Sequence, residues 1–204
     1  MNIVFDLAGV LLQWRPQVLL RRVLAERVPG DAEAAALAAR FFEGYGGDWG
    51  QFDRGTLAPE ALVPRIALRT GLTEAEVQRV MQAVFDELSP QAETVALMRS
   101  LQGAGHTLYY LSNMPEPYAA HLLRTHACFA YFADGVFSSR VHLIKPEPAI
   151  FALAAHRFGI EGQPAIFIDD VLANVQAAQA FGWQAVQFFS AAQCAEALHP
   201  LMNR

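Results

Sequence analysis

Polar residues that can act in catalysis or bind a metal follow several apolar runs of the sequence. They are Asp6, Ser112 with Asn113, Lys145, and the adjacent pair Asp169 and Asp170. A carboxylate can act as a nucleophile, and carboxylate oxygens suit Mg²⁺, which usually keeps several waters beside one or two carboxylates. The metal and the lysine would neutralise an anionic substrate, and a hydroxyl with backbone N–H groups could bind phosphate oxygens. This set of groups is suited to phosphoryl transfer.

The elements that must position these residues are short strands alternating with helices. An apolar run ends at Asp6, and a regular alternation begins at residue 91. The predicted strands cover residues 106–111, 136–138, 165–168 and 184–188, and the predicted helices cover 91–102, 116–125, 147–158 and 173–181. This alternation predicts a Rossmann-like α/β fold with a doubly wound parallel sheet. Ligands bind at the carboxyl ends of such strands, so the polar residues should meet at one edge.

Residues 14–88 have a different pattern, because they contain helix signals and no strand signal. Helices are predicted at 16–27, at 32–43, from Pro59, and from the capping box of Thr73 and Glu76 to about residue 87. The Gly-rich stretch 44–50 is predicted to be a loop. We therefore expect an all-helical domain at 14–88, inserted into an α/β core formed by 1–13 and 89–204.

Composition excludes several classes of protein. The chain has 204 residues, of which 53% are hydrophobic and 17% charged, so intrinsic disorder is excluded. The formal charge is −5 without a cluster of Lys and Arg, so no nucleic-acid partner is expected. No apolar stretch approaches the roughly 18 to 20 residues of a membrane span, and Asp6 interrupts the N-terminal apolar run early. Two cysteines cannot form a disulfide framework. We expect a soluble cytoplasmic protein.

The polar residues lie in four segments that resemble the motifs of one known family, the haloacid dehalogenase-like hydrolases. "IVFDLAGVL" resembles the first motif, "LYYLSN" the second, "IKPEPAIF" the third and "IFIDDVLANVQAA" the fourth. The key residues are separated by 106, 33 and 24 positions, which suits a helical cap after the first motif. "WGQFDRGTL" also resembles a cap segment of small bacterial members. The resemblance covers essentially the whole chain and implies a phosphatase-like member with an aspartyl-phosphate intermediate.

The resemblance also implies a role for each residue. Asp6 would be the nucleophile and a metal ligand, and the backbone carbonyl of Ala8 a second ligand. Asp170 would be a direct ligand of Mg²⁺, with Asp169 bound directly or through water. Ser112, Asn113 and Lys145 would bind the phosphoryl group, and Ser112 and Lys145 would also take part in catalysis. Lys145 would pair with both the phosphoryl group and Asp6.

Position 8 departs from the family pattern. Most phosphatases of the family have a second Asp two residues after the nucleophile, which acts as general acid and base, whereas this chain has Ala8. An alanine can neither protonate a leaving alkoxide nor activate water, and such catalysis typically contributes about 10²–10⁴-fold. We therefore expect a preference for good leaving groups, such as hexose 1-phosphates or aryl phosphates. His142, three residues before Lys145, is one candidate to replace the missing acid.

The expected function is Mg²⁺-dependent hydrolysis of a small phosphorylated metabolite, with a sugar phosphate favoured. One alternative is a 2-haloacid dehalogenase-type hydrolase, which needs no metal, although the pair Asp169 and Asp170 argues against it. Another is a catalytically weak protein that binds metal or phosphate. The cap segment with Trp49, Phe52, Asp53 and Arg54 is a candidate specificity surface. The pattern is compatible with a monomer or a homodimer.

Overall fold

A five-stranded parallel sheet forms the centre of the molecule, which is a computed structural model describing residues 1–202. The strand order is β3-β2-β1-β4-β5. The strands are β1 (Asn2–Phe5), β2 (Thr107–Ser112), β3 (Asp134–Phe137), β4 (Ala165–Asp169) and β5 (Gln184–Gln187). The first strand is central, with β2 on one side and β4 on the other. The predicted doubly wound parallel sheet is confirmed.

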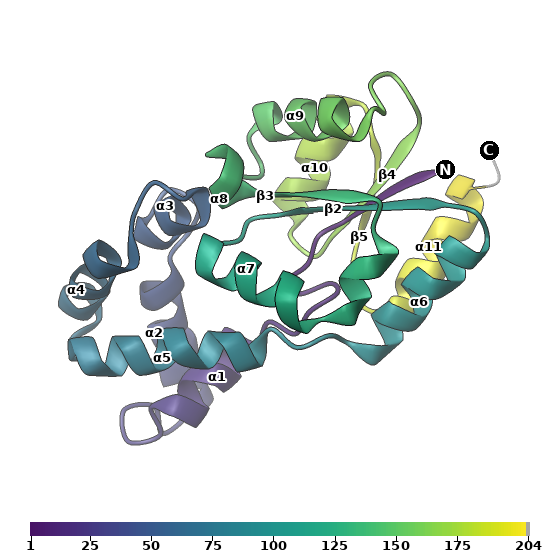
Figure 1. Cartoon of the computed structure of the whole chain (residues 1–204). Coiled ribbons are helices and arrows are strands. Elements are labelled where there is room, and N and C mark those ends of the chain that lie inside the picture. The colour runs from purple at the N-terminus through teal and green to yellow at the C-terminus, as the bar shows by residue number, and fades with distance from the viewer. Residues whose placement is uncertain (203–204) are drawn as a thin grey trace.

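The sheet is buried on both faces, which explains the continuous apolar runs in its strands. Ile3 and Phe5 of β1 belong to the hydrophobic cluster on one face, and Val4 belongs to the cluster on the other. Helices α9 and α10 cover one face, and α6, α7 and α11 cover the other (Figure 1). These helices are α6 (Ala92–Gly103), α7 (Glu116–Thr125), α9 (Pro148–Phe158), α10 (Leu172–Phe181) and α11 (Ala191–Met202).

Residues 14–88 form a group of helices beyond the carboxyl ends of the strands (Figure 1). We call these residues the helical segment. Its helices are α1 (Pro16–Val23), α2 (Asp31–Phe42), α3 (Asp48–Arg54), α4 (Pro59–Thr70) and α5 (Glu74–Glu87). The capping box at the start of α5 is confirmed, because Thr73 Oγ1 accepts from Glu76 N and the Glu76 side chain accepts from Thr73 N. Buried residues of the helical segment join the same hydrophobic cluster as Ile3 and Phe5.

The structure contains helices that the sequence pattern did not predict. Helix α3 begins at Asp48, inside the predicted loop 44–50, and the short elements η1 (Ala127–Tyr131) and α8 (Ser138–Val141) and helix α11 were also not expected. Helix α3 begins within the glycine-rich stretch 44–50, which has low helix propensity, so tertiary contacts must supply its stability. Trp49 and Phe52 of this helix are buried, with ring centroids 5.5 Å apart.

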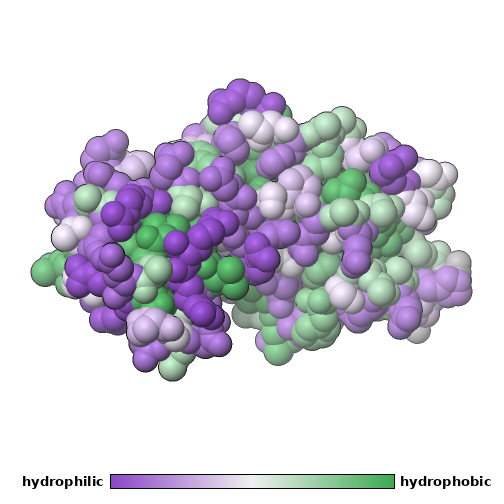
Figure 2. All heavy atoms as spheres, turned by 90° about the horizontal axis from the view of Figure 1, so that it is seen from below, coloured by the Kyte–Doolittle hydropathy of each residue, from purple (hydrophilic) through white to green (hydrophobic). Residues whose placement is uncertain are grey.

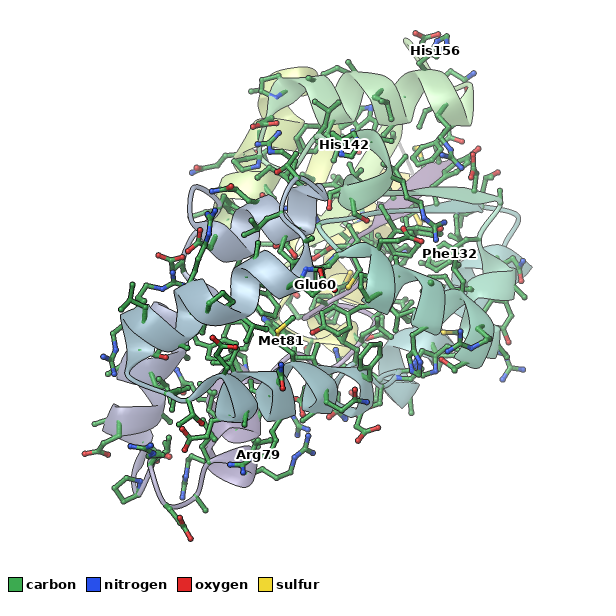
Figure 3. All side chains as sticks on the ribbon, turned by 60° about the vertical axis from the view of Figure 1, so that its left-hand side comes forward. Glu60, Arg79, Met81, Phe132, His142 and His156 are labelled. Carbon is green, nitrogen blue, oxygen red and sulfur yellow. The ribbon has the colours of Figure 1, made fainter. Side chains whose placement is uncertain are left out.

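The surface of the helical segment is not uniformly polar. Seen from below, hydrophobic residues gather on it among hydrophilic ones (Figure 2). A groove beside α4 and α5 is lined by Glu60, Val63, Met81 and Phe85, and Glu60 and Met81 both lie between these helices (Figure 3). No helix within residues 1–202 has the length and apolar character needed to cross a bilayer.

Candidate active site

Lys145 lies between two carboxylates at the carboxyl edge of the sheet. Its Nζ is 2.7 Å from Asp6 Oδ1 and 2.6 Å from Asp169 Oδ2. All three residues are buried, and the Lys145 side chain is only 1% exposed. Lys145 is also the single lysine of the sequence, in which the other 14 basic residues are arginine. The fold thus places its one lysine between two predicted site residues.

The sheet register explains how Asp6 and Asp169 meet. Phe5 of β1 is paired with Ile168 of β4, so the residues that follow both strands leave the sheet at the same level. The N–H of Asp6 donates to the carbonyl of Ile168 at 2.8 Å, which continues this register by one residue. Residues 163 positions apart therefore become neighbours because two parallel strands are in contact.

Asn113 fixes the loop that carries Lys145. Its Oδ1 accepts from the backbone N–H of Lys145 at 2.8 Å, and its Nδ2 donates to the Lys145 carbonyl at 2.9 Å. The sequence-based prediction placed Asn113 at the phosphate, and the structure uses its side-chain amide to hold the Lys145 backbone. Ser112 is fully buried at the end of β2, and its Oγ has no hydrogen-bond partner among the described residues.

The two acidic residues at the end of β4, Asp169 within the strand and Asp170 directly after it, have different surroundings. Asp169 accepts from Lys145 Nζ, from the backbone N–H of Val171 and, with both of its oxygens, from Asn174 Nδ2. Asp170 Oδ1 is buried and has no hydrogen-bond partner among the described residues. The carboxylates of Asp6, Asp169 and Asp170 each offer an oxygen within 4.8 Å of the others. Asp170 is thus the carboxylate with free capacity for a cation.

Gly9 allows the first loop to approach Asp170. Its φ is +89°, and a Cβ at this position would lie 2.4 Å from Asp170 Oδ2. Such an approach is open to glycine alone, since any side chain would be both strained and in collision with the carboxylate. The loop after β1 can therefore pack against Asp170 only because Gly9 has no side chain.

The acidic cluster favours protonation in the metal-free protein. Burial raises the pKa of Asp6 to about 7, with Lys145 opposing this rise and Asp169 and Asp170 adding to it. Burial and the neighbouring Asp169 raise the pKa of Asp170 to about 6. Burial alone would lower the pKa of Lys145, but the two carboxylates outweigh it and raise that pKa above its usual value. The site therefore holds a charged lysine beside carboxyl groups that gain from further positive charge.

A cavity of about 280 Å³ adjoins this cluster on the side of the helical segment. Ala8 and Asn113 line it from the sheet edge. Tyr45, Trp49 and Asp53 line it from the helical segment. The hydroxyl of Tyr45 accepts a hydrogen bond from Asn174 Nδ2 at 3.2 Å, which connects the cavity wall to Asp169 through one residue. A substrate in this cavity would lie next to the polar cluster.

Asp53 brings a further carboxyl group to the cavity that contains Ala8. Burial and the charge of Asp6 raise the pKa of Asp53 to about 8, although Lys145 opposes this rise. Its carboxyl group forms no hydrogen bond or ion pair with the described residues, whereas its backbone carbonyl accepts from Ser138 Oγ. The sequence placed Asp53 on a candidate specificity surface, and no pattern in the sequence indicated that it lies near Asp6.

His142, which the sequence offered as a replacement for the missing acid, lies elsewhere. It is exposed at the end of α8 and does not line the cavity (Figure 3). Its Nδ1 is 3.1 Å from the carbonyl oxygen of Arg54, so the ring contacts the helical segment rather than the acidic cluster. The position of His142 therefore gives no support to a role in proton transfer.

This arrangement can perform chemistry on a small anion. Asp6 offers a carboxylate oxygen beside a buried cation, Asp170 offers a free oxygen, and Ser112 offers a free hydroxyl. Together they provide a nucleophile, a place for a divalent metal and donors for phosphate oxygens.

Two curated relatives are phosphatases. The chain is 29% identical over 184 residues to a sesquiterpene phosphatase of Aspergillus oryzae, covering 88% of this chain and 85% of that protein. It is 29% identical over 147 residues to a phosphoglycolate phosphatase of Shigella boydii, covering 68% of this chain and 58% of that protein.

Solved structures share the fold over nearly the whole chain. A predicted HAD-like family hydrolase from Porphyromonas gingivalis matches with a TM-score of 0.72 at 24% identity, covering 100% of this chain and 98% of that one. A HAD family enzyme from Bacteroides thetaiotaomicron, in complex with magnesium and inorganic phosphate, matches with a TM-score of 0.69 at 21% identity, covering 91% and 92%. The family model for haloacid dehalogenase-like hydrolases matches residues 1–182, and this chain belongs to that family of enzymes.

Proposed function

We propose that this protein is a Mg²⁺-dependent phosphomonoester hydrolase that works through an aspartyl-phosphate on Asp6. The observation that carries the proposal is the position of Lys145, 2.7 Å from Asp6 and 2.6 Å from Asp169, beside the unpaired carboxylate oxygen of Asp170. The phosphatase relatives support the same reaction.

The residues present fit a magnesium ion. Three carboxylates offer oxygens within 4.8 Å of one another, and Asp170 Oδ1 is buried without a partner. We assign Asp6, Asp170 and the backbone carbonyl of Ala8 as direct ligands. Asp169 already accepts hydrogen bonds with both oxygens, which favours its binding through water. When bound, the ion would neutralise the charge of the phosphoryl group.

Each side chain of the site then has its own role in the reaction. A carboxylate oxygen of Asp6 attacks phosphorus, the bond between phosphorus and the ester oxygen breaks, and the alcohol leaves with a proton. Lys145 favours the ionised form of Asp6 and pairs with the phosphoryl oxygens, while Ser112 donates from its free hydroxyl and Asn113 holds Lys145 in place. Water then attacks phosphorus, which releases phosphate and restores Asp6.

Asp53 is the group that we assign to proton transfer in place of the missing Asp at position 8. It lines the same cavity as Ala8, and a pKa of about 8 keeps its carboxyl group protonated at neutral pH. A neutral carboxyl group can donate its proton to the leaving oxygen, and the carboxylate that results can accept a proton from the attacking water in the second step. The side chain comes from α3, so the reaction would depend on the position of the helical segment.

The helical segment would act as a cap over the site, as the sequence predicts for residues 14–88. Its Tyr45, Trp49 and Asp53 form walls of the cavity, and closure would exclude water from the aspartyl-phosphate. A cytoplasmic location, a small phosphorylated metabolite and a monomer or homodimer remain predictions.

Hydrolysis of p-nitrophenyl phosphate tests this function. Activity that requires Mg²⁺, is removed by EDTA and is lost in Asp6→Asn would support it. Chloride release from 2-chloropropionate without metal would select the dehalogenase instead. A protein that is silent in both assays but binds Mg²⁺ and phosphate would be the catalytically weak alternative.

A further inference from the structure

The cavity next to Asp6 has mainly apolar walls. Its larger apolar side chains come from the loop after β1, from α2 and α3, from α5 and the residue that follows it, and from the segment before α7. They are Trp14, Phe42, Trp49, Val84, Leu88 and Met114. Phe42 connects two of the aromatic rings, with its centroid 5.0 Å from Trp14 and 4.7 Å from Trp49. The part of a substrate beyond the phosphoryl group would therefore contact hydrocarbon and aromatic surface.

Most polar groups of the cavity are already engaged. Both side-chain atoms of Asn113 bind the Lys145 backbone, and the Tyr118 hydroxyl donates to the carbonyl of Met81 at 3.0 Å. Tyr45 accepts from Asn174, and Glu43 forms an ion pair with Arg69 at 3.0 Å. Among the described residues of the wall, the carboxyl group of Asp53 and the indole N–H groups of Trp14 and Trp49 have no such partner. A sugar in this cavity would bury several hydroxyl groups beside few free partners, and each hydroxyl group left unpaired is unfavourable.

The cavity also lacks positive charge. No Lys, Arg or His is among the described residues that line it, whereas Glu43 and Asp53 are. A substrate with a carboxylate or a second phosphate away from the reacting phosphoryl group would need a cation or several donors at that end. Such a substrate would meet acidic and aromatic groups instead.

We infer that the substrate is a phosphate monoester of an apolar alcohol or phenol, whose hydrocarbon group occupies the cavity lined by Trp14, Phe42 and Trp49. The inference rests on the proposed function, because it assigns the leaving group of that reaction. A volume of about 280 Å³ suits a small hydrocarbon group rather than a large one. This substrate class replaces the sugar phosphate that the sequence resemblance favoured.

A series of primary alkyl phosphates provides the test, because ethyl, butyl, hexyl and octyl phosphate have leaving groups of nearly equal basicity. Transfer of each added methylene into the cavity is expected to raise kcat/KM by up to about fourfold. The increase from ethyl to hexyl phosphate should therefore be at least about tenfold, and glucose 1-phosphate and phosphoglycolate should fall below hexyl phosphate. Equal rates along the series, or a preference for either polar substrate, would overturn the inference.

Variants of Phe42 test whether the dependence of kcat/KM on chain length arises in this cavity. Phe42→Gln is expected to reduce the dependence on chain length, whereas Phe42→Leu should retain most of it. Leu68→Gln removes an apolar side chain that is 88% exposed on α4, so it is a matched control and should leave the dependence unchanged. A chain-length dependence that is identical in Phe42→Gln and the wild type would contradict the assignment of this cavity.

A binding experiment keeps the inference separate from the proposed function. Trp14 and Trp49 line the cavity, so hexylphosphonate with Mg²⁺ should change the tryptophan fluorescence and bind at least tenfold more tightly than ethylphosphonate. Binding that follows chain length without turnover of any ester would refute the phosphatase and retain the apolar site. Turnover of p-nitrophenyl phosphate with equal binding of both phosphonates would refute the apolar site and retain the phosphatase.

Discussion

The sheet side and the helical side of the active-site cavity are built differently. On the sheet side, Lys145 contacts two carboxylates within 2.7 Å, and Asn113 and Asn174 hold the backbone and the carboxylate beside it. On the helical side, the wall contains the aromatic rings of Trp14, Phe42, Tyr45 and Trp49.

This difference separates the reaction from the choice of substrate. Paired charges at strand ends are held by sheet hydrogen bonds and buried contacts, and in the proposed reaction they would contact only the phosphoryl group that all phosphate monoesters share. The wall formed by the helical segment would select the alcohol, and it would also supply the proton through Asp53. Changes on the two sides should therefore affect different measurements.

Removal of the nucleophile should have the largest effect. Asp6→Asn is expected to lower kcat for p-nitrophenyl phosphate by about 10⁴-fold or more, as is found when a covalent nucleophile is lost from other enzymes. Steady-state assays of wild type and variant with saturating Mg²⁺ measure this loss. A reduction of less than tenfold would mean that Asp6 is not the nucleophile.

Removal of the buried positive charge of Lys145 should strongly destabilise the protein. Lys145→Met leaves Asp6 and Asp169 without their shared partner, which is expected to lower the free energy of unfolding by about 3–5 kcal/mol. Urea denaturation measures this change. The control is Arg140→Met, which breaks a surface pair with Glu116 whose side chains are 40% and 53% exposed, and should cost about 0–1 kcal/mol. Equal losses in the two variants would contradict the central position of Lys145.

Asp53 tests whether the helical side takes part in proton transfer. Asp53→Asn is expected to lower kcat for hexyl phosphate by about 10²-fold or more, because a poor leaving group needs a proton. The loss for p-nitrophenyl phosphate should be much smaller, since that leaving group is stable as an anion. A Brønsted series of aryl phosphates measures the difference. Equal losses for both substrates would indicate that Asp53 only supports the structure.

The pH dependence of stability provides a separate test of the same carboxyl group. The pKa of Asp53 is about 8 in the folded protein against an ordinary value of 3.8, so between these values the folded state binds a proton that the unfolded state has lost. The free energy of unfolding of the metal-free protein should therefore fall as pH rises from about 4 to about 8. Asp6 and Asp170 contribute in the same direction.

Urea denaturation of the metal-free protein at several pH values measures this dependence. Asp53→Asn should make the fall shallower, and Leu68→Gln should leave it as in the wild type. A fall of the same steepness in Asp53→Asn would show that this carboxyl group is not protonated in the folded protein at neutral pH.

The smallest effect is expected where the two sides meet at the surface. Arg54 of α3 donates to Glu147 Oε2 at 2.9 Å, and both side chains are partly exposed. Arg54→Gln should therefore cost about 0–1 kcal/mol of stability and lower kcat by less than tenfold. Thermal denaturation and p-nitrophenyl phosphate assays measure both values. A loss as large as that of Asp53→Asn would show that this ion pair positions α3.

Much of the sheet side could be predicted from the sequence. The apolar runs predicted the strands, and the polar residues that follow them include Asp6, Lys145 and Asp169. Their convergence needed only the rule that ligand-binding residues follow parallel strands at one edge. Tertiary contacts were needed to distinguish the two adjacent carboxylates, because Asp169 accepts hydrogen bonds with both oxygens whereas Asp170 has a free oxygen.

The helical side could be predicted only in outline. The pattern predicted helices in residues 14–88 but assigned the start of α3 to a loop, because burial of Trp49 and Phe52 outweighs the low helix propensity of this stretch. Asp53 approaches Asp6 because α3 contacts α8, where a Cβ at Gly55 would lie 2.5 Å from the carbonyl oxygen of Ser139. No local pattern encodes such a contact.

The sequence by itself determined the class of fold, the order of the four motifs and the absence of an Asp at position 8. These depend on residue type and on neighbours along the chain. Only the tertiary structure decided which carboxylate stays unpaired, which carboxyl group lines the same cavity as Ala8 and which side chains form the cavity wall. The physical reason is that these properties depend on burial and on contacts between residues far apart in the chain.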